Sequence, residues 1–281
     1  MNETLSKQIL SNFPFEPSEE QLSAIESLAG FVSGPDNRRI FILRGYAGTG
    51  KTSIIAALVR TLYNTGRKAV LMAPTGRAAK VMAGYSGMRA YTIHKQIYAV
   101  IPRESGGMSF SMRPNKLKNA VFIVDEASML TDRAGESLVN SSSSLLDDLL
   151  SYVFSGAGCR LILVGDRAQL PPVEYSDSPA LEERTFESGY GIDCTGIDLT
   201  RVYRQSQKSD ILHNATAIRQ AMADPDKLQW GSLKFRTGPD FVRLEDGYDI
   251  QSAIEGSYSA GGESETIIIT LSLIHISEPT R

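Results

Sequence analysis

Four apolar runs along the chain have the length and composition of strands that are buried on both faces of a parallel sheet. They cover residues 40–43, 68–73, 121–124 and 161–164, and each leads into a glycine-rich or polar segment. Stretches with apolar residues at helical spacing lie between them, as from Leu145 to Phe154, where Ser144 and Asp147 form a capping-box start. This alternation predicts an α/β fold with a parallel sheet flanked by helices.

A second pattern predicts a β-hairpin outside the main sheet. Residues 97–101 and 108–112 are compatible with β-strands, and the segment 103–107 between them is rich in turn-forming residues. We therefore expect a hairpin insertion over about residues 97–114.

The segment from Arg44 to Thr52 reads RGYAGTGKT and joins the first apolar run to a helix-compatible stretch. It matches G-x-x-x-x-G-K-[ST], in which glycines allow a tight turn whose N–H groups face one anion. The lysine adds a positive charge at the outer phosphates, and the final threonine hydroxyl can bind the Mg²⁺ that bridges them. The sequence thus predicts a site for a nucleoside triphosphate with Mg²⁺, formed by Gly45, Gly48, Thr49, Gly50, Lys51 and Thr52.

Two further strands end in polar groups at the same predicted edge of the sheet. Asp125 and Glu126 follow the run 121–124, and we expect Asp125 to hold Mg²⁺ and Glu126 to act as general base toward water. The run 161–164 leads into a loop where Gln169 can sense the γ-phosphate and Asp166 can support the backbone. Since the carboxyl ends of parallel strands meet at one edge, these groups are expected at one site.

Two positions have both a structural and a functional interpretation. Gln21 follows Ser18 by three residues, which fits a capping box, but its amide can also donate to and accept from adenine. The spacing alone favours the cap. Thr75 follows the run 68–73 and can either cap a helix or contact a phosphate backbone, with two basic residues nearby.

Composition limits the class of protein without identifying it. Hydrophobic residues make up 42% and charged residues 22% of 281 positions, as in an ordinary globular protein. The formal net charge of −3 excludes a uniformly basic nucleic-acid binder but not a local basic track. No apolar run approaches the roughly 20 residues of a membrane span, and the start lacks the features of a signal peptide, so a cytoplasmic location without membrane contact is expected.

The set of motifs resembles the superfamily 1 DNA helicases, and most closely the RecD-like branch, superfamily 1B, which includes the exodeoxyribonuclease V alpha subunit. The resemblance covers roughly residues 15 to 205. It rests on seven motifs in the family's order: Gln21 in the Q motif, Gly45–Thr52 in motif I, Ala73–Lys80 in motif Ia, Thr92–His94 in motif Ib, Val124–Met129 in motif II, Leu163–Val173 in motif III and Leu199–Gln205 in motif IV.

This resemblance implies further residue roles. Gln21 becomes an expected adenine contact, Tyr203 would stack on the adenine, and Arg204 would be the arginine finger that stabilises charge on the γ-phosphate. The hairpin would be the pin that parts a duplex, although its tip carries no aromatic residue. The expected contacts with single-stranded DNA are Pro74, Thr75 and His94, with Phe110 on the return arm of the hairpin stacking on a base.

The resemblance also implies the domain organisation and the activity. Residues 1–174 are expected to form a first RecA-like motor domain, and residues 175–270 part of a second one. The implied activity is ATP-dependent translocation on single-stranded DNA, with 5′-to-3′ polarity, and unwinding at a duplex fork, with repair or recombination subunits as candidate partners. The alternatives are an RNA-directed helicase of the same superfamily and a nucleotide-binding regulatory module that unwinds nothing.

The last third of the chain carries three more expected elements and an unusual end. Helices are expected after Ser209 and over residues 250–258, and a strand over residues 266–270. The segment 271–281, LSLIHISEPTR, resembles the in-frame translation of a sequencing-library adaptor. We therefore expect this chain to be an amino-terminal fragment, cut at about Thr270 with a non-native tail beyond it, so that the helicase activity is expected of the longer parent protein; the alternative is a native strand followed by a disordered end.

Overall fold

The computed structural model of the chain describes residues 2–34, 38–102, 107–202, 209–223, 234–262 and 265–269. The chain divides into two compact units, Met1–Ser206 and Gln207–Arg281. Within the described residues, no helix has both the length and the apolar character that crossing a membrane requires.

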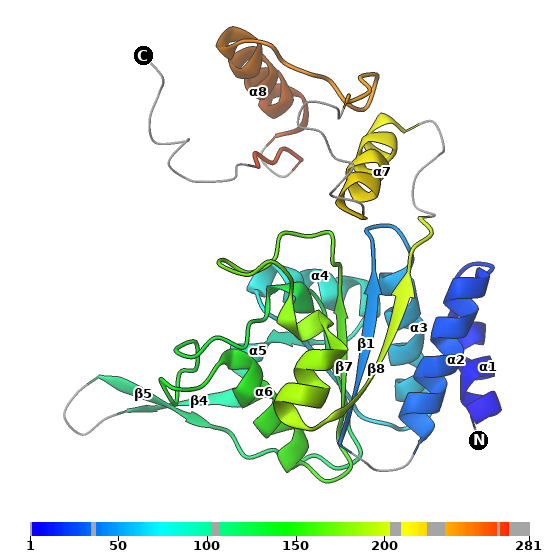
Figure 1. The fold of residues 1–281 in the computed structure, drawn as a ribbon, viewed down its shortest axis with the longest axis vertical. Helices are drawn as coiled ribbons and strands as arrows, with labels where there is room; N and C mark the ends of the chain where they lie inside the picture. The colour runs from blue at the N-terminus through cyan, green and yellow to red at the C-terminus, as the bar shows by residue number, and fades with distance from the viewer. Residues whose placement is uncertain are drawn as a thin grey trace. The chain divides into compact units, whose positions relative to one another are not determined.

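A six-stranded parallel sheet forms the centre of the first unit (Figure 1). Its order is β3-β2-β6-β7-β1-β8, so that β7 separates the strand before the glycine loop from the strand before Asp125. The four predicted strands are confirmed, and β3 and β8 are additional. The bounds are β1 (Arg39–Gly45), β2 (Ala69–Ala73), β3 (Ala90–Thr92), β6 (Val121–Val124), β7 (Arg160–Gly165) and β8 (Asp193–Leu199).

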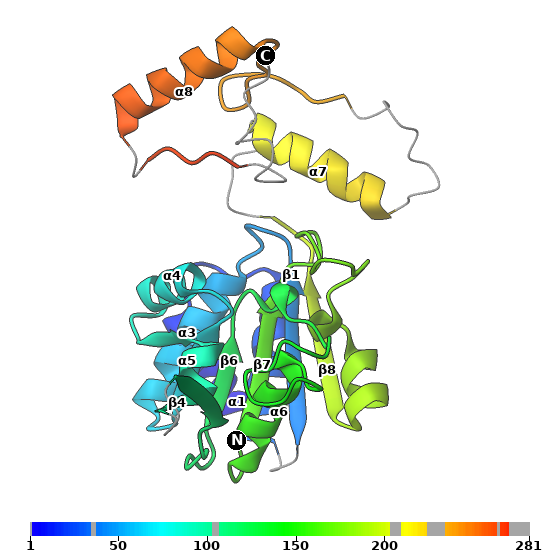
Figure 2. The same cartoon turned by 90° about the vertical axis from the view of Figure 1, so that its left-hand side faces the viewer.

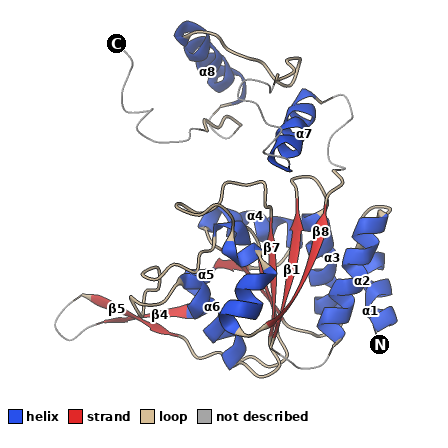
Figure 3. Cartoon of the chain, viewed as in Figure 1, coloured by secondary structure: helices blue, strands red, loops and turns tan. Residues whose placement is uncertain are grey.

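Helices cover both faces of this sheet, as Figures 2 and 3 show. Alternate strand residues enter two separate cores: Phe41 and Leu43 of β1 point into one, and Ile40 and Ile42 into the other. The first core is completed by α1 (Asn2–Asn12), α2 (Glu19–Ser33), α3 (Lys51–Asn64) and α4 (Gly76–Ser86). The second core is completed by α5 (Ile93–Ile97), α6 (Leu145–Ser155), η2 (Pro179–Leu181) and η3 (Thr185–Gly189).

Both predicted capping boxes are present. Ser18 begins α2 and Ser144 begins α6, and in each case the serine hydroxyl accepts from the backbone N–H three residues on while that residue's side chain accepts from the serine N–H. These bonds satisfy N–H groups that the first helical turn leaves without partners.

The predicted hairpin is also confirmed. β4 (Tyr98–Pro102) and β5 (Met108–Met112) pair antiparallel in a separate two-stranded sheet. At its root, the Tyr98 hydroxyl donates to Asp148 Oδ2 on α6 at 2.5 Å, which fixes the hairpin to the main body of the unit.

The boundary expected after residue 174 is corrected by β8. This strand pairs parallel with β1 over its whole length, from Arg39 opposite Asp193 to Gly45 opposite Leu199. The first compact unit therefore extends to Ser206. β8 reads DCTGIDL, and as an edge strand it keeps polar residues, so a search for continuous apolar runs does not reveal it.

The second unit contains the two predicted helices, α7 (Asp210–Ala223) and α8 (Gly247–Gly261). The strand expected over 266–270 is not confirmed, because residues 266–269 are irregular and pair with no strand in the described part of the chain. A strand needs a neighbour for its backbone groups, and β-propensity alone does not supply one. Residue 270 and the segment 271–281 lie outside the described residues, and the RecA-like character of this unit stays a prediction.

Candidate functional site

The glycine loop that follows β1 needs its glycines for distinct reasons. At Gly45, a Cβ would lie 2.7 Å from Thr49 Oγ1 and 2.9 Å from the main-chain oxygen of Leu199. Gly48 and Gly50 have φ angles of +83° and +100°, which side-chain-bearing residues rarely adopt. The loop is closed by Thr49, whose hydroxyl donates to the main-chain oxygen of Tyr46 at 2.9 Å.

Helix α3 begins directly after the loop, at Lys51. The Lys51 ammonium lies along the loop and donates to the main-chain oxygens of Gly45 and Tyr46, at 2.5 and 3.0 Å. The Lys51 ammonium, the first N–H groups of α3 and the positive end of the helix dipole therefore lie at one place. Such a place binds phosphate groups.

A cavity of about 860 Å³ opens at the carboxyl edge of the sheet, beside this loop. It brings together residues from the loops after β1, β6 and β7, as the strand order predicts, with additional walls from the segment before α2 and from α4. The predicted site residues that line it are Gln21, Gly48, Gly50, Lys51, Thr52, Asp125, Glu126 and Gln169.

Gln21 caps its helix and also holds the glycine loop. Its Oε1 accepts from the Ser18 N–H at 3.0 Å, and its Nε2 donates to the main-chain oxygen of Thr49 at 2.9 Å. A Cβ on Gly50 would lie only 2.4 Å from that nitrogen. The capping interpretation is thus confirmed, the loop contact was not foreseen, and the adenine contact stays a prediction.

The two carboxylates after β6 have different surroundings. Asp125 Oδ1 accepts from the Glu126 N–H at 2.9 Å, and Asp125 Oδ2 accepts from the Tyr85 hydroxyl at 2.8 Å. Glu126 has a φ of +54°, a left-handed conformation that costs roughly 1–3 kcal/mol in a residue other than glycine. Strain of this kind is concentrated at functional sites.

Tyr85 was not found from the sequence, where an aromatic residue on a helix has no distinguishing signal. Burial, the charge of Asp125 and the hydrogen bond to it together raise the pKa of Tyr85. Its hydroxyl therefore keeps its proton and acts as a donor to Asp125.

The loop after β7 is tied to the loop after β6. The Ser128 hydroxyl donates to Gln169 Oε1 at 2.8 Å, so the predicted γ-phosphate sensor contacts the segment that follows Glu126. Asp166 Oδ1 accepts from the Ala168 N–H at 2.8 Å, which confirms that Asp166 supports this loop.

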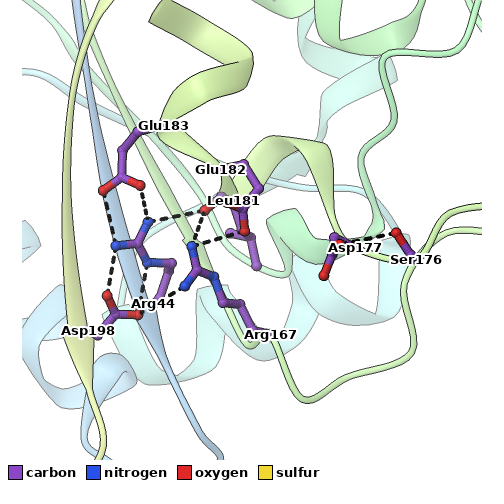
Figure 4. Close-up of polar contacts among 8 residues, drawn as sticks. All are labelled: Arg44, Arg167, Ser176, Asp177, Leu181, Glu182, Glu183 and Asp198. Carbon is purple, nitrogen blue, oxygen red and sulfur yellow. Dashed lines mark hydrogen bonds and ion pairs between the residues drawn. The ribbon is translucent and has the colours of Figure 1, made fainter. Parts of the chain in front are cut away.

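A charged cluster lies beside the cavity and joins β1 to β8 (Figure 4). The buried Arg44 guanidinium lies between Asp198 and Glu183, with ion pairs of 2.7 and 2.9 Å, and it also donates to the Leu181 oxygen. Arg167, two residues before Gln169, pairs with Glu182 at 2.9 Å. The cluster thereby connects β1, which precedes the glycine loop, with β8 on one side and with the loop after β7 on the other.

The segment that leaves β8 is held by α2. The Glu20 carboxylate accepts from the N–H groups of Thr200 and Arg201, at 2.8 and 3.1 Å, and from the Thr200 hydroxyl at 2.6 Å. Tyr203 and Arg204, predicted for adenine stacking and as arginine finger, follow directly but lie outside the described residues.

None of the four residues predicted to contact DNA lines the cavity. Thr75 caps α4, accepting from the Ala78 N–H at 3.2 Å, and Pro74 precedes it. The His94 ring packs 5.8 Å from that of Tyr98. Phe110 lies on β5 and is 40% exposed.

The donor atoms at the cavity fit magnesium. No group of three or more His, Cys, Asp and Glu residues in the described ranges could hold a metal by itself. Thr52 and Asp125 offer a hydroxyl and a carboxylate at the same cavity. Mg²⁺ is commonly held by one or two such protein oxygens together with phosphate oxygens, so this set suits it.

Comparison with known proteins decides the family. A family model described as AAA domain matches residues 16–232. The chain belongs to this AAA domain family. It is 34% identical to the ATP-dependent RecD2 DNA helicase of Deinococcus radiodurans, over 77% of the chain and 25% of that protein. This likeness confirms the predicted resemblance to RecD-like superfamily 1B helicases.

Two further proteins show more distant similarity. The ATP-dependent DNA helicase dda of Enterobacteria phage T4 is 31% identical over 66% of the chain and 39% of that protein. The crystal structure of the Pif1 helicase from Candida albicans is 20% identical with a TM-score of 0.47, covering 73% of this chain and 44% of that one. The chain thus spans about a quarter of RecD2 and 39% of dda.

Proposed function

We propose that this chain carries the nucleotide-hydrolysing motor of an ATP-dependent DNA helicase, which translocates 5′-to-3′ on single-stranded DNA and unwinds a duplex at a fork. The observation that carries the proposal is the meeting of Lys51, Thr52, Asp125, Glu126 and Gln169 at one cavity. The names of RecD2 and dda, both ATP-dependent DNA helicases, support the choice of DNA and ATP.

The residues of the cavity divide the work of hydrolysis. Lys51 and the N–H groups of the glycine loop bind the outer phosphates of ATP, while Thr52 and Asp125 hold Mg²⁺, which neutralises phosphate charge when bound. Glu126 accepts the proton of the attacking water, and Gln169 senses the γ-phosphate. Gln21 and Tyr203 contact the adenine, and Arg204 stabilises charge on the transferred group.

Single-stranded DNA binds along Pro74, Thr75 and His94, and the hairpin parts the duplex. Four apolar side chains of β4 and β5 are at least 40% exposed, namely Val100, Ile101, Met108 and Phe110. The Phe110 ring can stack on a base, and aliphatic side chains such as Ile101 and Met108 can wedge between bases, and neither contact reads the sequence. Such a motor works in the cytoplasm, with repair or recombination subunits as candidate partners.

The first test is ATP hydrolysis by the full product of the gene with Glu126→Gln. We expect the variant to bind a fluorescent ATP analogue as the wild type does and to hydrolyse ATP at least about 100-fold more slowly, since a general base contributes 10²–10⁴ in rate. Glu174→Gln is a matched control, because Glu174 is also left-handed, with a φ of +72°, but does not line the cavity. Unchanged turnover in Glu126→Gln would show that the general-base assignment is wrong.

The substrate is tested by comparing single strands of DNA and RNA as activators of hydrolysis. We expect DNA to stimulate, and equal stimulation by RNA would contradict the choice of DNA. The full product of the gene, assayed on forked duplexes with a single 5′ or 3′ tail, tests unwinding and polarity. Unwinding of only the 3′-tailed substrate would overturn the 5′-to-3′ direction.

A further inference from the structure

The Asp125 carboxylate is held at both of its oxygens before any ligand arrives. One bond is local, from the neighbouring Glu126 N–H, but the other comes from Tyr85, 40 residues earlier in the chain. Tyr85 and Asp125 both line the cavity beside Lys51 and Thr52. A carboxylate oxygen has two lone pairs, so Asp125 Oδ2 can accept from Tyr85 and still bind a metal or its water.

Tyr85 lies on helix α4, so a movement of this helix also moves the tyrosine side chain. Helix α4 spans 11 residues; its Met82 is buried in the core that it shares with α3, Tyr85 packs against that core, and Ala79 is also buried. Val81, one turn before Tyr85, lines the same cavity. The position of the tyrosine hydroxyl therefore follows the position of α4 as a unit.

The other end of α4 lies in the proposed DNA track. Thr75 caps the helix, and Pro74 precedes it at the end of β2. A strand of DNA bound at this start would contact one end of α4, and a metal bound at Asp125 would act on the other end through the hydrogen bond from Tyr85. Two sites that bias the same element are coupled, and each changes the affinity of the other by the same factor.

We propose that Tyr85 is a positioning residue that sets the orientation of the Asp125 carboxylate and couples the metal site to DNA bound at the start of α4. The proposal rests on the proposed function, because it takes Asp125 as the metal-binding residue and Thr75 as a DNA contact. It adds a residue that belongs to none of the helicase motifs matched in the sequence.

The first test measures metal affinity, not turnover, in Tyr85→Phe, which removes a single oxygen atom. Binding of Mn²⁺ to the ADP-loaded 281-residue chain is followed by the electron paramagnetic resonance of free Mn²⁺. We expect binding to weaken by about tenfold, as is typical when a residue that orients a metal ligand is removed. The far-ultraviolet circular dichroism of Tyr85→Phe should match that of the wild type, which shows that the variant is folded.

Tyr190→Phe is the matched control. Its hydroxyl, also half-buried, donates to Asp147 Oδ1 at 2.7 Å, and neither residue lines the cavity. We expect Mn²⁺ affinity in Tyr190→Phe to equal that of the wild type. Unchanged affinity in Tyr85→Phe, or an equal loss in both variants, would overturn the positioning role.

Asp125→Asn separates failure of this proposal from failure of the proposed function. If Asp125→Asn leaves Mn²⁺ affinity unchanged, the metal assignment itself is wrong. If Asp125→Asn weakens binding and Tyr85→Phe does not, the metal assignment holds and only the role of Tyr85 is lost.

The coupling is tested by adding oligothymidylate of about 15 nucleotides to the same titration. We expect DNA to change Mn²⁺ affinity of the ADP-loaded wild type by at least about fivefold, and the factor to fall toward one in Tyr85→Phe. A factor of one in the wild type, or the same factor in both proteins, would contradict the coupling.

Discussion

Arg44 Nη2 and Asp198 Oδ2 lie 2.7 Å apart and join the strand that leads into the glycine loop to the edge strand of the sheet. The two residues are also register partners in the β1–β8 ladder, and Arg44 Nε donates to Asp198 Oδ1 at 2.9 Å. A paired guanidinium fork of this kind fixes both distance and direction. The edge strand β8, which precedes Thr200, is thereby held to β1, the strand that leads into the glycine loop.

We expect Arg44→Ala to lower the free energy of unfolding by about 2 kcal/mol, because it removes a buried guanidinium together with its bonds to Asp198, Glu183 and the Leu181 oxygen, while the two carboxylates that it leaves are partly exposed. Denaturant titration measures this. Arg133→Ala removes an ion pair with Glu174 in which both side chains are exposed, and should cost less than about 1 kcal/mol. Equal costs for the two variants would contradict a structural role for the Arg44 cluster.

The same cluster predicts a pH dependence. The hydrogen bond from Arg44 outweighs burial and holds the pKa of Glu183 below its ordinary value of 4.5. The stabilisation is therefore complete above about pH 4.5 and is lost as the pH falls through the lower folded-state pKa. We expect the stability difference between wild type and Glu183→Gln to shrink from pH 6 to pH 3. If this stability difference grew on acidification, the hydrogen bond from Arg44 would not be its origin. The same conclusion would follow if Glu183→Gln had the same pH-dependent effect in an Arg44→Ala background.

Gly50→Ala should abolish tight nucleotide binding. An alanine at this position would adopt a φ of +100°, and its Cβ would lie 2.4 Å from Gln21 Nε2, so the Gln21 amide or the loop must shift and the bond between them is disturbed. Gly66→Ala is the matched control, with a φ of +70° and open space around it, and should cost about 1–2 kcal/mol of stability alone. Titration with a fluorescent nucleotide distinguishes the two, and similar affinities in both variants would show that the Gln21 contact does not matter.

The two roles of Gln21 can be separated by mutation. Ser18→Ala removes the cap hydroxyl and should cost about 1 kcal/mol of stability while leaving nucleotide affinity unchanged. Gln21→Ala removes the cap and also the bond to the Thr49 oxygen, and we expect it to weaken nucleotide binding by about tenfold. If both variants bind the nucleotide equally well, Gln21 is only a capping residue.

Much of the first unit could be predicted because its determinants are local. The strands at 40–43 and 121–124 are continuous apolar runs, and the glycine loop has a fixed spacing, so each can be recognised without its neighbours. The common edge for Lys51, Asp125 and Gln169 follows from parallel strand direction alone. By contrast, β8 was missed because an edge strand carries no continuous apolar signal, and 266–269 was overpredicted because strand propensity does not provide a partner.

The sequence by itself determined which strands form the centre of the sheet and which polar groups they bring to one cavity, and with them the chemistry that we propose for it. Only the tertiary structure decided the contacts that orient those groups. Tyr85 reaches Asp125 across 40 residues, and Arg44 reaches Asp198 across 154. Such pairs leave no periodic or local pattern in the chain, because their distance in space is set by the packing of helices and strands and not by their separation in sequence.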